Sequence, residues 1–132
     1  MPPASKILIV DDEPLMRELV RSMLEHDGHS VVVADGGENA LDEFRRAKRT
    51  DEPFSAVITD LGMPKMDGRV LANRIKTESP TMPVIMLTGW GALIRSDEGK
   101  PVQVDCVLSK PPKIYELRQA LRRTVQTASA LA

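Results

Sequence analysis

Five short apolar runs are spaced along the chain, and each of them ends at a charged or turn-forming residue. The runs cover residues 6–10, 30–34, 55–60, 82–87 and 104–109. Their length and their Val and Ile content are typical of β-strands. The first run has no polar alternation, and a strand that is apolar on both faces is usually covered on both faces, as in a parallel sheet.

Between these runs, apolar residues recur at intervals of three and four, which is the spacing of helices with one buried face. The first helix is predicted to start at Pro14, which suits the first helical turn, and to end before Gly28. A helix that starts near residue 91 would be short or irregular, because Gly99 and Pro101 would end it early. The apolar positions expected to face the core are Met16, Leu19, Val20, Met23 and Leu24 in the first helix, Ala40, Leu41, Phe44 and Ala47 in the second, Val70, Leu71 and Ile75 in the third, and Ile114, Leu117, Leu121 and Val125 in the last.

Strands that alternate with helices predict an α/β fold, with one doubly wound, five-stranded parallel sheet and helices on both of its faces. The length of 132 residues corresponds to a single domain. We expect residues 1–132 to form that domain, with its core at about 6–125 and with frayed ends.

Polar side chains stand at the ends of four of the five predicted strands. Asp11 and Asp12 follow the first strand, Asp60 ends the third, Thr88 follows the fourth and Lys110 follows the fifth. Because the carboxyl ends of parallel strands meet at one edge of a sheet, where α/β proteins bind their ligands, we expect these five side chains to lie close together.

Crowded carboxylates repel one another, and a hard divalent cation with a preference for oxygen ligands relieves that repulsion. Lys110 adds a positive charge, and Thr88 adds a hydroxyl donor on a short, stiff side chain. Asp is a known covalent nucleophile, so a carboxylate, a metal, a cation and a hydroxyl at one place predict a phosphoryl-transfer site.

The chain resembles the receiver domains of two-component response regulators, which are related to the chemotaxis regulators. The resemblance rests on four blocks in this order: ILIVDDE at 7–13, DLGMPKMDG at 60–68, TG at 88–89 and LSKP at 108–111. It extends from about residue 6 to residue 125. It implies a flavodoxin-like fold with strand order 2-1-3-4-5, and a signalling protein that catalyses only its own phosphorylation and dephosphorylation rather than an enzyme.

The resemblance also implies a role for each residue of the site. Asp60 matches the phosphoacceptor, which takes a phosphoryl group from a phosphohistidine in a Mg²⁺-dependent reaction. Asp12 matches a direct Mg²⁺ ligand, Asp11 its neighbour that often acts through water, and Gly62 the residue whose carbonyl is the backbone ligand.

The two remaining site residues match groups that contact the phosphoryl group. Thr88 matches the switch hydroxyl, and Lys110 matches the cation that binds the phosphoryl oxygens. The bond between Lys110 and Pro111 is expected to be cis, as it is in the family.

Two positions depart from the family pattern. Val107 stands where many receivers carry a Tyr or Phe that turns inward on activation, and a valine cannot make that movement. Trp90 stands two residues after Thr88, at a position that modulates loss of the phosphoryl group, and its indole could shield the site from water. A short fourth helix would also alter the face that this helix, the fifth strand and the last helix form as a common output surface.

The partners that the resemblance implies are a sensor histidine kinase or a histidine phosphotransfer protein, and an output protein that the sequence does not name. The chain after Val125 is too short for a DNA-binding effector domain, so we expect a stand-alone regulator or a receiver cut from a larger protein such as a hybrid kinase. It is expected to be a monomer or a weak, phosphorylation-dependent dimer.

Composition limits the alternatives. The net charge of −1 carries no electrostatic signature of nucleic-acid or membrane binding. A single cysteine, Cys106, excludes an intrachain disulfide, and no apolar run reaches the length of a membrane span. Residues 1–6 lack a signal-peptide pattern. We expect a cytoplasmic protein.

Other functions and simpler roles remain possible from the residues alone. The chain could be a receiver-like interaction module that is not phosphorylated, or a phosphatase with an Asp nucleophile, although Gly62 stands where such enzymes commonly carry a second Asp. Asp11 and Asp12 could cap the helix at Pro14. The simplest expectations for the remaining polar and sulfur-containing positions are a turn at Asp67-Gly68, surface sites for His26 and His29, and a small buried side chain at Cys106.

Overall fold

Five parallel strands form one sheet in the order β2-β1-β3-β4-β5, which confirms the predicted architecture. The computed structural model describes residues 5–89 and 104–131, with side chains as far as residue 125. The strands are β1 (Lys6–Val10), β2 (Ser30–Ala34), β3 (Ala56–Asp60), β4 (Val84–Thr88) and β5 (Cys106–Ser109).

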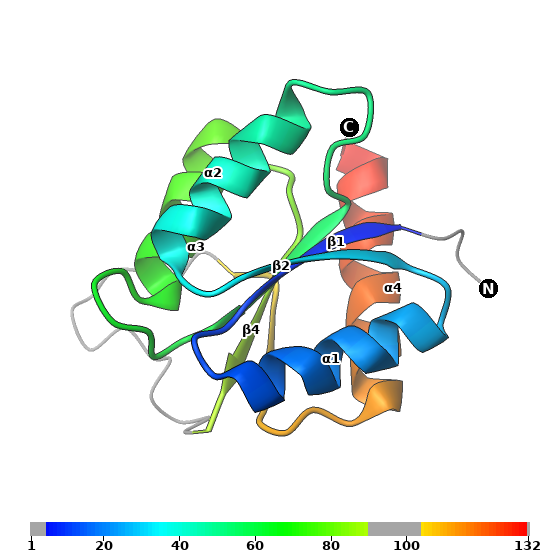
Figure 1. Cartoon of the computed structure of the whole chain (residues 1–132). Coiled ribbons are helices and arrows are strands. Elements are labelled where there is room, and N and C mark those ends of the chain that lie inside the picture. Colours follow the sequence, from blue (N-terminus) through cyan, green and yellow to red (C-terminus); the bar gives the residue numbers. More distant parts are fainter. Residues whose placement is uncertain (1–4, 90–103, 132) are drawn as a thin grey trace.

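Four helices are described, and they cover the two faces of the sheet in pairs (Figure 1). They are α1 (Pro14–His26), α2 (Gly37–Lys48), α3 (Gly68–Glu78) and α4 (Ile114–Leu131). One apolar cluster lies between the sheet and α2 and α3, and the other lies between the sheet and α1 and α4. The short helix predicted near residue 91 lies outside the described residues, so α4 is the helix that the sequence predicts last.

Strands β3 and β4 in the middle of the sheet are fully buried, but both edge strands, β2 and β5, are partly exposed. Every residue of β3 and β4 is buried, as expected for strands that are covered on both faces. In β5, half-buried and exposed residues alternate, and Val107 is 37% exposed. Cys106 is half-buried rather than buried, and Arg123 donates a hydrogen bond from Nη2 to its Sγ at 3.7 Å. The predicted burial of Cys106 was wrong because β5 is an edge strand.

Two local predictions for α3 were also wrong. Val70 was expected to face the core, but it is 41% exposed, and the buried face of α3 carries Leu71, Ala72 and Ile75 instead. Asp67 does more than form a turn, because its Oδ1 accepts hydrogen bonds from the N–H groups of Arg69 (2.9 Å) and Val70 (3.1 Å). Asp67 is therefore the N-cap of α3.

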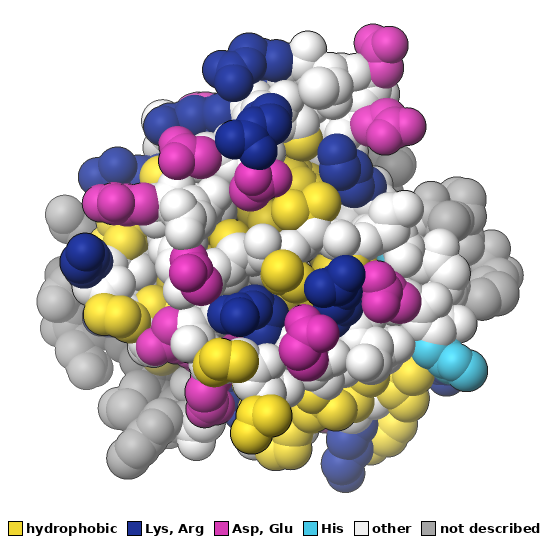
Figure 2. Space-filling model, in the orientation of Figure 1, with side chains coloured by type: hydrophobic (Ala, Val, Ile, Leu, Met, Phe, Trp, Pro, Cys, Tyr) yellow, Lys and Arg dark blue, Asp and Glu magenta, His cyan; other side chains and the backbone are white. Residues whose placement is uncertain are grey.

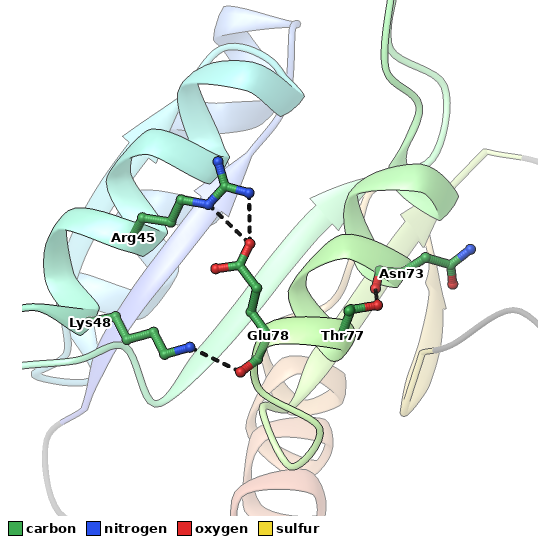
Figure 3. A network of polar contacts seen from close by, with 5 residues as sticks. All are labelled: Arg45, Lys48, Asn73, Thr77 and Glu78. Atoms are coloured by element: carbon green, nitrogen blue, oxygen red, sulfur yellow. Dashed lines mark hydrogen bonds and ion pairs between the residues drawn. The ribbon is translucent and has the colours of Figure 1, made fainter.

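The ends of α2 and α3 are joined by polar contacts (Figure 3). Arg45 of α2 donates from Nε (3.0 Å) and Nη2 (2.7 Å) to Oε2 of Glu78 in α3. Lys48 donates from Nζ to the backbone carbonyl of Glu78 at 2.9 Å, which provides a partner for a carbonyl at the end of the helix. These contacts fix α2 and α3 relative to each other on one face of the sheet.

On the other face, a bidentate pair joins α4 to the end of α1. Arg118 donates from Nε and Nη2 to the two carboxylate oxygens of Asp27, at 2.8 Å each. This hydrogen bonding lowers the pKa of Asp27, against the opposing effect of burial.

Figure 2 shows positive and negative side chains intermingled over the visible face, in keeping with a net charge of −1. No helix in the described part of the chain combines the length and apolar character needed to cross a bilayer.

Candidate functional site

The three predicted carboxylates and the predicted lysine meet at the carboxyl edge of the sheet. Asp11 and Asp12 directly follow β1, Asp60 is the last residue of β3, and Lys110 directly follows β5. Oxygen atoms of Asp11, Asp12 and Asp60 all lie within 4.8 Å of one another. Asp11 and Asp60 are buried, whereas Asp12 is exposed. The parallel register brings these residues together although they come from distant parts of the chain.

Lys110 lies between two of these carboxylates. Its Nζ is 3.0 Å from Asp60 Oδ1 and 3.2 Å from Asp11 Oδ2. The Lys110–Pro111 peptide bond is cis, as expected, and the backbone N–H of Lys110 donates to the carbonyl of Thr88 at 2.9 Å. Burial acts to lower the pKa of Lys110, but the hydrogen bond to Asp60 and the charges of Asp11 and Asp60 outweigh burial, so the net shift is upward. Lys110 therefore stays positively charged at the site.

Asp60 is held in an environment that opposes its ionisation. The residue is 6% exposed. Burial raises its pKa most, the hydrogen bond from Lys110 lowers it, and the negative charges of Asp11 and Asp12 raise it further. The net shift is upward. Ionised Asp60 is thus a net cost to the folded protein, which is common for groups placed for chemistry.

The raised pKa of Asp60 predicts that replacing its carboxylate with a neutral group will stabilise the folded protein, and that the size of this gain will depend on pH. A carboxyl whose pKa is higher in the folded state binds more protons there than in the unfolded chain, so its contribution to stability falls as pH rises through the interval between the two values. Asp60→Asn should therefore unfold at a higher urea concentration than wild type at pH 7 without divalent cations. The gain should shrink as pH falls toward about 4, the ordinary range of a carboxyl group.

The check is urea denaturation followed by circular dichroism at both pH values. Asp51→Asn, which changes an exposed loop carboxylate, is the control and should leave the midpoint nearly unchanged. If Asp60→Asn is less stable than wild type at pH 7, the attraction to Lys110 outweighs burial and the assigned electrostatic balance is wrong.

Asp11 carries a buried oxygen without a hydrogen bond. Its Oδ1 accepts from the backbone N–H of Glu13 at 2.9 Å. Its Oδ2 is buried and accepts no hydrogen bond of good geometry from the described residues, although Lys110 Nζ is 3.2 Å away. Glu13, rather than either aspartate, is the N-cap residue of α1, and its own side chain makes no capping bond. A buried carboxylate oxygen with no hydrogen bond, beside two further carboxylates, is a donor set that suits a hard cation such as Mg²⁺.

Thr88 and Gly62 lie at the same edge of the sheet. Thr88 ends β4 and is 1% exposed. Gly62 is exposed, two residues beyond Asp60 in the loop that leaves β3. Their roles beside the proposed phosphoacceptor remain predictions. Trp90 lies outside the described residues, and the predicted shielding by its indole stays a prediction.

One residue that supports the site was expected from the sequence only to form a turn. A Cβ on Gly68 would lie 2.3 Å from the carbonyl oxygen of Asp60 and 3.1 Å from its carbonyl carbon. Gly68 also donates a backbone hydrogen bond to Leu61 at 2.8 Å. The start of α3 therefore packs directly on the backbone of Asp60, and only a glycine leaves room for it. The Asp-Gly pair was visible in the sequence, but turn formation explained it equally well.

A parallel sheet of order 2-1-3-4-5 with an acidic cluster and a lysine at its carboxyl edge defines the receiver class of signalling domains. The family model of the response regulator receiver domain matches residues 7–122. The chain belongs to that family, as its sequence motifs indicated.

Named relatives support the same assignment. The response regulator FleR of Pseudomonas aeruginosa is 38% identical over 118 residues, which are 89% of this chain and 23% of that protein. The receiver protein CpdR of Brucella abortus is 30% identical over 123 residues, which are 93% of this chain and 98% of that protein. The chain spans about half the length of several other relatives, among them the probable transcriptional regulator ycf27 of Guillardia theta (48%). The relatives are signalling proteins.

Solved structures agree in fold. A receiver domain protein from Clostridium thermocellum matches with a TM-score of 0.86 and 30% identity, over 97% of this chain and 99% of that one. The response regulator TrrA of Thermotoga maritima, solved in complex with Mg²⁺ and BeF, matches with a TM-score of 0.79 and 30% identity, over 91% of this chain and 98% of that one.

Proposed function

We propose that this domain accepts a phosphoryl group on Asp60 and changes its affinity for a partner in response. The observation that carries the proposal is the position of the Asp60 carboxylate, 3.0 Å from the Lys110 ammonium and within 4.8 Å of the other two carboxylates. The donor is a phosphohistidine on a sensor histidine kinase or on a histidine phosphotransfer protein. The output partner is a protein, and the domain acts as a monomer or as a weak, phosphorylation-dependent dimer in the cytoplasm.

The chemistry follows from the side chains. An Asp60 oxygen attacks the phosphorus, the bond from phosphorus to the donor nitrogen breaks, and an acyl phosphate forms while the histidine recovers its proton from solvent. Lys110 stabilises the charge on the transferred oxygens, and the Thr88 hydroxyl donates a hydrogen bond to one of them. Hydrolysis of the acyl phosphate later restores the carboxylate.

Mg²⁺ fits the donor set of Asp11, Asp12, Asp60 and the carbonyl of Gly62. When bound, the ion neutralises the charge that would otherwise repel the incoming phosphoryl group. Asp11 Oδ2, which accepts no hydrogen bond within the described residues, and the match to TrrA, which was solved with Mg²⁺ and BeF, support this assignment.

The charge that phosphorylation adds acts by shifting the populations of two conformations of the domain. Phosphorylation can favour one conformation only by the difference in its interaction energy between the two states. Val107 is exposed on β5 and cannot make the inward movement of an aromatic side chain, so the output of this domain depends on other groups. The same domain forms nearly all of CpdR and a small part of FleR, so it suits either a stand-alone regulator or part of a longer protein.

The test is intact mass after incubation with acetyl phosphate, with Mg²⁺ or with a chelator. We expect the gain of one phosphoryl group with Mg²⁺ and almost none with the chelator, and peptide mapping should place it on Asp60. No gain in either condition would contradict the proposal. If Mg²⁺ still stabilised that protein against thermal unfolding, the domain would be a metal-binding interaction module instead.

A further inference from the structure

Arg17 on α1 reaches back to the end of β1 and contacts the backbone of the acidic site. Its Nη1 donates a hydrogen bond to the carbonyl oxygen of Asp11 at 2.9 Å. Within residues 5–89 and 104–125, no carboxylate lies within ion-pair distance of its guanidinium. The side chain is half-buried. The Arg17 guanidinium thus binds the neutral carbonyl of Asp11 rather than a carboxylate. This contact holds the backbone at Asp11 in place.

The other polar atoms of Asp11 are also held. Its N–H donates to the carbonyl of Ala34 at 3.2 Å, and its Oδ1 accepts from Glu13. With the carbonyl held by Arg17, Oδ2 is the one polar atom of Asp11 that has no hydrogen bond to the part of the chain that the structure describes, and it lies beside Lys110 and the other carboxylates. The direction of that oxygen is therefore set by the three contacts on the rest of the residue.

The same carbonyl controls Asp12. A peptide unit is planar, so the position of the Asp11 carbonyl fixes the N–H and Cα of Asp12. Asp12 is exposed, and in the described part of the chain its carboxylate has no hydrogen bond or ion pair to orient it. Its placement within 4.8 Å of the other two carboxylates thus depends on the backbone that Arg17 holds.

We infer that Arg17 is a positioning residue for the cation site, and that it acts by fixing the peptide between Asp11 and Asp12. This inference rests on the proposed function, since it assumes that the carboxylates bind Mg²⁺. It predicts a change in Mg²⁺ affinity for Arg17→Met that is opposite to the change expected from the charge of Arg17 alone. A positive guanidinium near a cation site repels the cation, so charge alone predicts that Arg17→Met binds Mg²⁺ more tightly. Loss of positioning predicts weaker binding.

The test is isothermal titration of the unphosphorylated protein with MgCl₂ alone. Arg17→Met should weaken Mg²⁺ binding about 10-fold, as is usual when a group that orients a metal ligand is removed. Arg17→Lys keeps the charge and one donor, and its affinity should lie between those of Arg17→Met and wild type. Thermal unfolding of each variant without metal establishes that the titrated protein is folded.

Arg21→Met is the matched control, because Arg21 lies one turn further along α1 and pairs with Glu18 and Glu25 on the outer face. It should bind Mg²⁺ as wild type does. Equal or tighter binding by Arg17→Met, weaker binding by Arg17→Lys than by Arg17→Met, or an equal loss in Arg21→Met would each overturn the inference. If wild type itself binds no Mg²⁺, the proposed function fails and this inference fails with it; if wild type binds Mg²⁺ and is phosphorylated, only the role of Arg17 is at issue.

Discussion

Asp60→Asn is expected to gain no phosphoryl group from acetyl phosphate and Mg²⁺ under conditions in which wild type gains one. An amide oxygen carries no negative charge and does not form a stable acyl phosphate, so the substitution removes the nucleophile and keeps the shape of the side chain. The fold should survive, because an uncharged residue is favoured at this buried position, where burial and two neighbouring carboxylates raise the pKa of Asp60. Intact mass of the two proteins, incubated in parallel, is the measurement.

Asp67→Asn is the matched control for that experiment. Asp67 stands in the loop after β3, seven positions beyond Asp60, and its carboxylate caps α3 through the N–H groups of Arg69 and Val70. Asparagine is an equally good N-cap, so this variant should fold and be labelled as wild type is. Labelling of Asp60→Asn, or a label that maps to Asp11 or Asp12 in wild type, would show that Asp60 is not the acceptor.

Gly68→Ala is expected to lower the free energy of unfolding by about 1–3 kcal/mol, the usual range for overpacking in a well-packed region. The new Cβ would lie 2.3 Å from the carbonyl oxygen of Asp60 and 3.1 Å from Leu61 Cα. Both neighbours are backbone atoms, so no flexible side chain can move aside. Alanine favours a helix by about 1 kcal/mol over glycine, which offsets only part of this loss. Phosphorylation should slow as well, because the backbone that must shift belongs to Asp60, the proposed acceptor.

Urea denaturation and the initial rate of phosphoryl gain measure both effects. Gly62→Ala serves as the control for stability alone, since an added Cβ there has no described heavy atom within 4 Å, and its free energy of unfolding should change by less than about 0.5 kcal/mol. A Gly68→Ala protein with wild-type stability and wild-type rate would mean that α3 and β3 can separate without consequence for Asp60.

Stability and chemistry oppose each other at this site. The carboxylates of Asp11 and Asp60 are buried beside a third, and one lysine contacts both of them. Removal of one charge should stabilise the fold, as predicted for Asp60→Asn, yet it removes the proposed acceptor. The proposed phosphoryl transfer and cation binding, rather than folding, would account for the presence of three acids at this site.

Sequence patterns were sufficient for the fold because its signals are local. Apolar runs marked all five strands to within two residues at each end, since a strand that is buried on both faces must be apolar throughout. Parallel topology then placed Asp60, Thr88 and Lys110 at one edge, because every such strand ends on the same side. Apolar runs also marked the two edge strands, β2 and β5, although these are only partly buried and Val107 of β5 is 37% exposed.

The sequence by itself thus determined the class of fold, the family and the residues that gather at the site. Only the tertiary structure decided how they are held: the contact of Arg17 with the Asp11 carbonyl, the approach of Lys110 to Asp11 Oδ2, and the close approach of Gly68 to Asp60. These features depend on the distance between segments that are separate in the chain and on the path of the loops between them. The spacing of apolar residues along the chain cannot predict such distances, because it indicates which face of an element is buried and not which residues pack against that face.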